Sequence, residues 1–370
     1  MTERVRGLEL DRRGRARRRW LTLMGGFAMA SAALPAAALA REIAPHPLLA
    51  QAASGANPPN AFAALVALAK AEGEVTLYSS ATENVARRVA TAFTEKYGVK
   101  VQFLRLAGTA LLQRYATEAE AGNFAADILF GAGNTGRFAS EAVQKGWLEA
   151  IAQAGLPVVT SGEFPAKYMR QVTALVQIAP WLITFNTDRV KGADVPKDWL
   201  DILDPKFRGQ ILLPDPRASD SYIDFWSLLL DKYGESFFDR MRAQMPRQFT
   251  SGVPAVQALG AGEGAFELPA VPAQVQAIQV RGAPLGMVQP PHTTGVEMQV
   301  FVTHRAKAKH PNAARLLANY VMSKEGNQVF NDDPGSVSVY DESRLPAQYE
   351  SPNDNTMARK DQIIKLLGFQ

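Results

Sequence analysis

Residues 74–122 read EVTLYSSATENVARRVATAFTEKYGVKVQFLRLAGTALLQRYATEAEAG, and this stretch decides the fold class. Residues 74–78 alternate polar and apolar side chains, with Val75 and Leu77 on one face, which is typical of a half-buried strand. Residues 81–97 place an apolar side chain at every fourth position, as along one side of an amphipathic helix. Those side chains are Val85, Val89, Phe93 and Tyr97. The first half of the stretch therefore predicts a strand followed by a helix.

This strand–helix pattern recurs twice before residue 150. Residues 99–103 and 126–130 have strand patterns, and residues 109–121 and 136–145 have helix patterns. Each predicted helix is followed by a glycine, a common helix terminator: Gly98, Gly122 and Gly146. Strands that alternate with helices through short connections indicate a mainly parallel, doubly wound sheet with right-handed crossovers. We therefore expect an α/β fold.

The second half of the chain repeats this architecture. Strand and helix patterns alternate from residue 186 to residue 292, which predicts a second doubly wound α/β lobe. The first lobe is expected over residues 73–180, completed by part of residues 300–370. Residues 172–186, interrupted at Pro180-Trp181, and residues 295–303 are long apolar stretches. We expect these two stretches to cross between the lobes as hinge strands.

The N-terminal 40 residues have the pattern of an export signal. Arginines concentrated in residues 12–19 precede an apolar run over residues 21–34 and the ending Ala38-Leu39-Ala40. These are the three parts of a cleavable secretory signal. Arg17-Arg18-Arg19-Trp20-Leu21 also resembles a twin-arginine signal, and an ordinary arginine-rich signal is the alternative. We expect cleavage near Ala40, a periplasmic protein, and a leader with a first helix over residues 41–72.

Charge and cysteine content argue against some kinds of binding site. The chain has 40 Lys+Arg and 36 Asp+Glu, but eight arginines and three acidic residues lie in residues 1–40, which leaves 32 basic and 33 acidic residues. The pI of about 9.2 is therefore largely a property of the signal and gives no reason to expect nucleic-acid binding. The chain has no cysteine, which excludes disulfides and thiolate metal sites.

Small and polar residues fill the turns after the predicted strands of the first lobe. They are Ser79, Ser80 and Thr82, then Gly108 and Thr109, then Gly133 and Asn134. In open α/β sheets these turns meet at one edge, where ligands bind. Glycine lets a ligand approach the backbone, and helix N-termini favour anions. The alternative is that Ser80, Thr109 and Thr135 only cap helices.

Further candidate ligand contacts come from the second half of the chain. They are Trp181, Ser219, Ser221, Tyr222, Glu267 and His292. Trp181 can stack on a ligand ring or only plug the hinge, and a carboxylate at Glu267 can recognise an amine or hydroxyl or be a solvated strand end. Arg137 and Arg217 can supply a counter-charge to an anion or be solvated surface residues.

Four segments in the same order resemble a known family. They are residues 74–86 (strand, Tyr-Ser-Ser, helix), 106–126 (Leu-Ala-Gly-Thr-x-Leu-Leu-Gln-Arg), 185–190 (Phe-Asn-Thr-Asp) and 309–330 (Lys-His-Pro-Asn-Ala-Ala-Arg-Leu-Leu). Together they resemble the periplasmic solute-binding proteins of ABC importers, in the type II branch that includes ferric-iron and organic-solute binders. The resemblance implies two lobes that close on a small-molecule ligand, no cofactor, and delivery to an inner-membrane ABC permease. We expect a monomer.

The resemblance leaves the substrate open. Ferric-ion members of this branch use an adjacent tyrosine pair, whereas none of the nine tyrosines here are adjacent, and no histidine follows Ser80. We therefore expect a small polar, anionic organic solute: a phosphonate, a sugar phosphate or a carboxylate. Ferric iron or an iron chelate is the alternative. A sensory partner that presents its ligand to a receptor is another. A periplasmic enzyme is an alternative of a different class, although no Gly-x-Ser-x-Gly, Walker or His-Glu-x-x-His motif occurs.

Overall fold

The structure is a computed structural model that describes residues 60–133 and 135–369. The predicted export signal, its cleavage site near Ala40, most of the leader and Asn134 lie outside the described residues. Helix α2 (Ala61–Glu72) is the first described element. Within the described ranges, no helix combines the length and the apolar character that a membrane span requires.

The first lobe is built on a six-stranded sheet in the order β2-β1-β3-β12-β4, with β5 also paired to β12. Strands β1 (Glu74–Ser79), β2 (Lys100–Arg105) and β3 (Ile128–Ala132) are parallel, as predicted. The other three are β4 (Leu148–Glu149), β5 (Ala174–Pro180) and β12 (Gly295–Thr303). Strand β12 is antiparallel to β3, β4 and β5, because the chain returns to this sheet from the second lobe.

Strand alternation gives the first sheet two apolar faces. Leu77 lies in one core, to which helices α3 (Glu83–Tyr97) and α11 (Pro311–Met322) also contribute side chains. The next residue, Tyr78, lies in the opposite core with α4 (Gly108–Glu120) and α5 (Gly136–Gln144). Helices on both faces of a mainly parallel sheet confirm the predicted α/β class.

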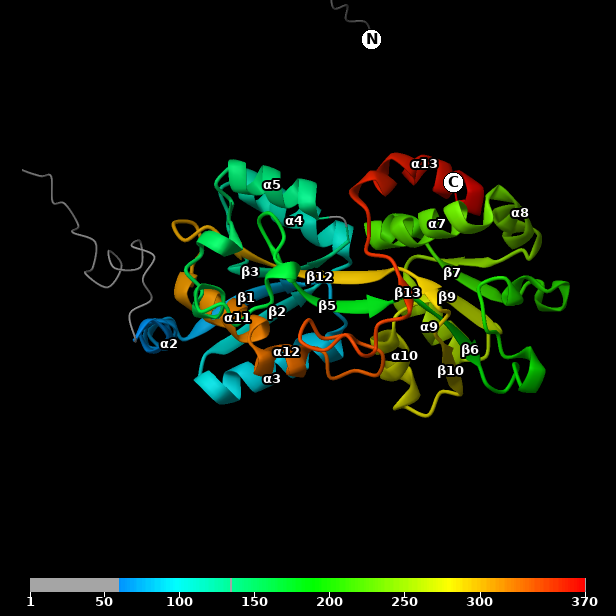
Figure 1. Cartoon of the computed structure of the whole chain (residues 1–370), viewed down its shortest axis with the longest axis horizontal. Coiled ribbons are helices and arrows are strands. Elements are labelled where there is room, and N and C mark those ends of the chain that lie inside the picture. Colours follow the sequence, from blue (N-terminus) through cyan, green and yellow to red (C-terminus); the bar gives the residue numbers. More distant parts are fainter. Residues whose placement is uncertain (1–59, 134, 370) are drawn as a thin grey trace, which may run out of the picture. The chain divides into compact units, whose positions relative to one another are not determined.

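The second lobe is built on a five-stranded sheet in the order β10-β6-β9-β7-β8. Its strands are β6 (Leu182–Asn186), β7 (Ile211–Pro214), β8 (Arg247–Phe249), β9 (Phe266–Ala270) and β10 (Leu285–Val288). Helices α7 (Asp220–Tyr233), α8 (Glu235–Ala243) and α13 (Lys360–Leu367) cover one face, and α9 (Gly252–Gly260) and α10 (Pro272–Gln279) the other (Figure 1).

The break in residues 172–186 at Pro180-Trp181 separates two strands, because the chain leaves the first sheet at Pro180 and joins the second at Leu182. Residues 269–280 have a helix pattern in the sequence, but the helix begins only at Pro272, because β9 continues through Ala270 before the chain turns.

The chain passes between the two sheets three times. The passages are β5 to β6, β10 to β12, and the segment after α12 (Lys324–Phe330). Along the last passage, β13 (Gln348–Tyr349) pairs with β11 (His292–Thr293). Helix α13 then returns to the second lobe, where Ile363 and Leu367, four residues apart, are buried in the core.

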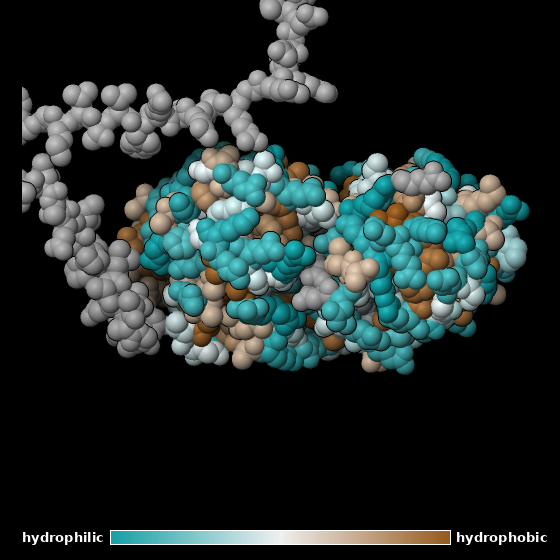
Figure 2. Space-filling view, turned by 90° about the horizontal axis from the view of Figure 1, so that it is seen from above, coloured by the Kyte–Doolittle hydropathy of each residue, from teal (hydrophilic) through white to brown (hydrophobic). Residues whose placement is uncertain are grey.

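Short elements complete the connections. Helix α6 spans Pro157–Thr160. The 3-10 turns are Ile151–Gln153, Ala166–Tyr168, Gly192–Asp194, Asp201–Leu203, Pro205–Phe207, Pro216–Ala218 and Asp354–Arg359. Hydrophilic residues cover most of the face shown in Figure 2, with apolar residues scattered among them. That distribution is ordinary for a protein surface.

Candidate functional site

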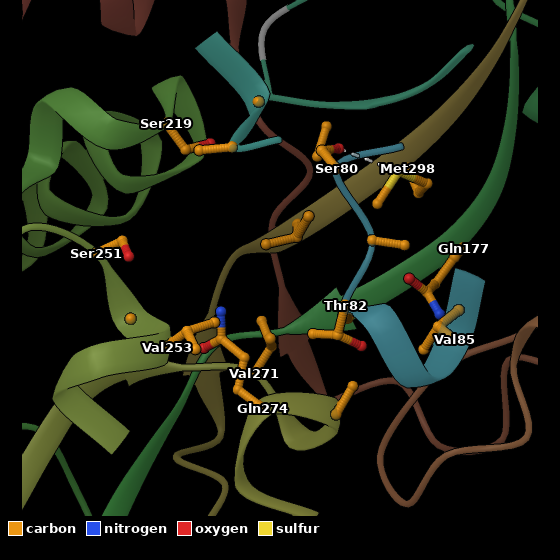
Figure 3. A pocket seen from close by; sticks show the side chains of 18 of the residues that line it. Ser80, Thr82, Val85, Gln177, Ser219, Ser251, Val253, Val271, Gln274 and Met298 are labelled. Atoms are coloured by element: carbon orange, nitrogen blue, oxygen red, sulfur yellow. Dashed lines mark hydrogen bonds between the residues drawn. The ribbon is translucent and has the colours of Figure 1, made fainter. Parts of the chain in front are cut away.

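A cavity of about 80 Å³ lies between the helix-start loops of the two sheets. In Figure 3, Ser80 and Thr82 of the first lobe lie on one side of this space, and Ser219 and Ser251 of the second lobe lie on the other. The lobes approach each other closely beside the cavity. A Cβ atom added to Gly108 would lie 3.4 Å from Ser219 Oγ, and one added to Gly133 would lie 3.4 Å from Ser221 Oγ. Both positions still require glycine, since a Cβ on Gly108 would lie 2.8 Å from Ala132 O of its own lobe and Gly133 has a φ of 101°.

Five helices begin at the wall of this cavity. The lining contains the N-cap residues of α3, α4, α7, α9 and α10, which are Thr82, Ala107, Ser219, Ser251 and Val271. Only Ser219 accepts a capping hydrogen bond from its own helix. The other four helices have no side-chain cap. The positive ends of these helix dipoles favour an anion here, although Gly252 N–H of α9 already donates to Tyr222 and α10 begins at Pro272, which has no N–H.

Arg105 is the one charged side chain among the described residues that line the cavity. It ends β2, directly beside Ser79 of β1. Its half-buried guanidinium has no hydrogen bond or ion pair with residues 60–133 or 135–369. An unpaired guanidinium offers a planar set of donors to a carboxylate or phosphate-like group.

Tyr222 and Trp181 form an aromatic wall. Their rings stack with centroids 5.1 Å apart, and the Tyr222 hydroxyl accepts a hydrogen bond from Gly252 N–H at 3.2 Å. Burial raises the pKa of Tyr222 above its ordinary value, and the nearby Glu267 adds to the effect, whereas Gly252 N–H and Arg105 oppose it. Tyr222 is therefore a neutral phenol at physiological pH.

Much of the remaining wall is apolar. The larger apolar side chains are Val85, Val253, Val271, Val296 and Met298. Several polar side chains in the wall already have protein partners. Ser80 Oγ donates to Phe130 O at 3.1 Å, and Gln177 Nε2 donates to Ser336 Oγ at 3.4 Å. Thr82 Oγ1, Trp181 Nε1 and Gln274 Oε1 are buried without a partner in the described part of the chain.

A second, larger groove of about 1710 Å³ lies on the other face of β12. Val296 and Met298 point to the cavity, and the alternate residues Glu297 and Gln299 line the groove. Its charged residues are paired: Arg137 with Glu141 at 2.9 Å, Arg170 with Glu297 at 3.1 Å, and Asp220 with Lys360 at 3.6 Å.

The residues predicted from the sequence are divided between these spaces. Six line the cavity: Ser80, Thr82, Gly108, Trp181, Ser219 and Tyr222. Two line the groove: Thr109 and Gly133. Ser79, Ser221, Glu267 and His292 line neither, and Asn134 lies outside the described residues. Both arginines proposed as counter-charges are paired, Arg137 with Glu141 and Arg217 with Asp215.

Each of the four residues outside both spaces has a structural explanation. Ser79 Oγ accepts from Ala81 N–H, and His292 pairs with Glu350. Ser221 lies in the first turn of α7 and is fully buried, beside Gly133 of the other lobe. Glu267 lies in the middle of β9, opposite Leu212 and Thr184, so its side chain enters the second lobe.

Sequence reasoning missed Arg105, Gln177, Ser251, Gln274 and Ser336, which all line the cavity. Arg105 had a usable signal, because it is the last residue of a predicted parallel strand, at the edge where ligands bind. The other four depend on which distant segments the fold brings together: Gln177 lies in β5, Gln274 in α10, and Ser251 and Ser336 outside helices and strands.

The described residues contain no group of three or more His, Cys, Asp or Glu side chains that could hold a metal ion. Tyr222 is the one tyrosine among the described cavity residues, and it is neutral. Ferric iron prefers several anionic oxygen ligands, which this wall does not offer.

Three comparisons with known proteins agree with this geometry. Residues 125–365 match a family model described as bacterial extracellular solute-binding protein. A Haemophilus influenzae protein described as uncharacterized is 28% identical over 272 residues, which are 70% of this chain and 76% of that protein.

Two solved structures show the same two-lobed fold. The periplasmic binding protein AfuA from Actinobacillus pleuropneumoniae, with fructose-6-phosphate bound, is 20% identical with a TM-score of 0.61, over 80% of this chain and 99% of AfuA. Iron-bound HitA from Pseudomonas aeruginosa is 14% identical with a TM-score of 0.60, over 80% of this chain and 98% of HitA.

Proposed function

The chain belongs to the family of bacterial extracellular solute-binding proteins, and from that premise we propose that it captures a small anionic organic solute in the cavity between its lobes. The family binds solutes for ABC transporters and is not a family of enzymes. The bound solute would then be delivered to an inner-membrane permease. Export by a twin-arginine signal with cleavage near Ala40 remains a prediction, in agreement with an extracellular family.

One observation carries the proposal. Five helix N-termini and the unpaired Arg105 surround a cavity whose described lining contains no carboxylate. Each of these features lowers the free energy of a buried anion, and together they provide both charge and hydrogen-bond donors. The acidic group can be a phosphonate, a phosphate ester or a carboxylate, because all three present oxygens to the same donors.

The alternatives have less support. Direct ferric-iron binding needs anionic oxygen ligands, whereas the cavity offers the neutral Tyr222. Iron held with an exogenous anion is the remaining form of this alternative, and the same donors would suit that anion. A hydrolytic enzyme needs a general base, and the described lining contains no Asp, Glu, His or Lys.

A ligand screen with a matched pair of variants tests the proposal. Phosphonates, phosphate esters, carboxylates, thiamine, polyamines and Fe(III) are compared by thermal shift. A ligand at 100 times its Kd should add about 2.7 kcal/mol of stability. Arg105→Met should weaken binding of the stabilising anion by about 30- to 100-fold, as for the loss of a charge-assisted hydrogen-bond pair.

Arg137→Met is the control, because the Arg137 side chain is 90% exposed and paired outside the cavity. Equal loss of affinity in both variants would contradict the proposal. Stabilisation by cations alone, or a visible absorption band on adding Fe(III) without an organic anion, would replace it with another ligand class.

A further inference from the structure

We propose that the solute is a compact acid with an apolar body and no cationic group. This inference rests on the proposed function and specifies its substrate class. Three properties of the cavity carry it: the charges in its wall, the partners already held by its polar side chains, and its size.

The charge of the wall selects against an ammonium group. Arg105 can neutralise one acidic group, and the described lining contains no carboxylate to neutralise a cation. The buried Glu267 is not an exception, because it lies inside the second lobe and does not line the cavity. Burying a cation without a counter-ion is costly. A zwitterion such as an aminoalkyl acid would therefore bind worse than the same acid without its amine.

The polar side chains of the wall offer more free donors than free acceptors. Ser80 and Gln177 already donate, to Phe130 O and to Ser336 Oγ. Ser219 Oγ accepts from Ser221 N–H, so its own hydroxyl proton is still available. Thr82 Oγ1 and Trp181 Nε1 are buried donors without a partner in the described part of the chain, and Gln274 Oε1 is an acceptor without one. The available donors suit the oxygens of an acid.

Apolar side chains from both lobes cover the rest of the space. Val85 and Met298 belong to the first lobe, and Val253 and Val271 to the second; all four are labelled in Figure 3. A sugar ring would place several hydroxyls against these side chains, where each loses its hydrogen bonds to water. A hydrocarbon body loses nothing there and gains from burial.

The size of the cavity limits the body to a few atoms. One water needs about 10–15 Å³ of such free space. The cavity of about 80 Å³ therefore holds roughly six non-hydrogen atoms. Ethylphosphonate has that number of non-hydrogen atoms, whereas a hexose phosphate such as glucose 6-phosphate has more than twice as many.

Matched probes test the inference by isothermal titration. Ethylphosphonate is compared with 2-aminoethylphosphonate, which adds only an ammonium group, and with glucose 6-phosphate. Butanoate and 4-aminobutanoate form the corresponding carboxylate pair and show which acidic group is preferred. We expect the amine-free member of the preferred pair to bind at least tenfold more tightly than its amino analogue and than glucose 6-phosphate.

A substitution at Val253, in the first turn of α9, is designed to reverse the preference for the amine-free acid. An aspartate there is compatible with the helix, because acidic residues are favoured at helix N-termini. Val253→Asp should reverse the preference toward the amino analogue, and the neutral control Val253→Asn should not. Preservation of the secondary structure is checked by circular dichroism.

The outcomes separate this inference from the proposed function. Tighter binding of an amino analogue or of glucose 6-phosphate to the native protein overturns the inference, but the proposed function stands if Arg105→Met abolishes that binding. If none of the acids binds, both fail.

Discussion

The two faces of strand β12 border spaces that differ in whether their charged side chains have partners. On one face, Val296 and Met298 border a small cavity in which the Arg105 guanidinium has no partner among the described residues. On the other face, Glu297 lines a groove about twenty times larger, and it is held by Arg170 and by the Tyr349 hydroxyl at 3.3 Å. The proposed function therefore rests on the unpaired donors of the small cavity and not on the volume of the groove.

The groove face has a mechanical consequence. Arg170 precedes β5, Glu297 lies on β12, and Tyr349 lies on β13, so this cluster joins all three passages between the sheets. A buried pair is strongly destabilising to break, because the remaining partner loses its counter-charge. On the proposed function the cavity face binds the solute, whereas the contacts of Glu297 with Arg170 and Tyr349 connect distant segments on the groove face.

The largest expected effect comes from filling the cavity. Ser80→Leu should weaken ethylphosphonate binding by at least 100-fold, because the added carbon atoms occupy a space of about 80 Å³. Isothermal titration measures the loss. Gln171→Leu adds the same kind of side chain to the groove and should leave affinity unchanged. Equal losses in the two variants would mean that both spaces contribute to binding.

Breaking the paired face should affect stability instead. Glu297→Gln should lower the free energy of unfolding by about 2 kcal/mol, less than for a fully buried pair because the Arg170 side chain is 35% exposed. Urea denaturation measures this change. Glu141→Gln breaks an exposed pair with Arg137 and should cost less than about 0.5 kcal/mol. Similar losses in the two variants would refute the distinction.

Glu267 provides a carboxyl that is buried and unpaired, in contrast with Glu297. Burial raises its pKa well above the ordinary value of 4.5. The folded protein therefore keeps a proton that the unfolded chain releases above pH 4.5, and stability falls as pH rises from there toward the folded pKa. The slope from this group is about 1.4 kcal/mol per pH unit.

Replacing this carboxyl should remove its part of the pH dependence. Glu267→Gln should gain stability relative to the native protein as pH rises from 5 to 7, measured by urea denaturation at each pH. Stability profiles that run parallel over this range would show that Glu267 does not stay protonated in the folded protein.

The smallest expected effect comes from the third member of the groove cluster. Tyr349→Phe removes one hydrogen bond to Glu297 and leaves the Arg170 pair intact. A loss of about 1.5 kcal/mol in the free energy of unfolding is expected, at the low end for a hydrogen bond to a charged group because this one is 3.3 Å long. A loss larger than that of Glu297→Gln would assign the main role to the tyrosine.

Local sequence patterns predicted most helices and strands, but not which distant segments they contact. The stripe from Val85 to Tyr97 and the alternation in residues 74–78 predicted α3 and β1, because helix and strand periodicities are properties of the chain itself. The pairing of Arg137 with Glu141 was also predictable, since residues four apart are neighbours on a helix. That spacing already argued against Arg137 as a counter-charge.

The sequence alone determined the α/β class, the two-lobed organisation and the positions of the small polar turns, because these depend on interactions between residues close in the chain. Only the tertiary structure decided that Arg105 meets Tyr222 and Ser251, that Glu267 enters a core, and that α13 joins the second lobe. These outcomes depend on which distant segments meet and on the face to which strand register turns a side chain, and no local pattern encodes either.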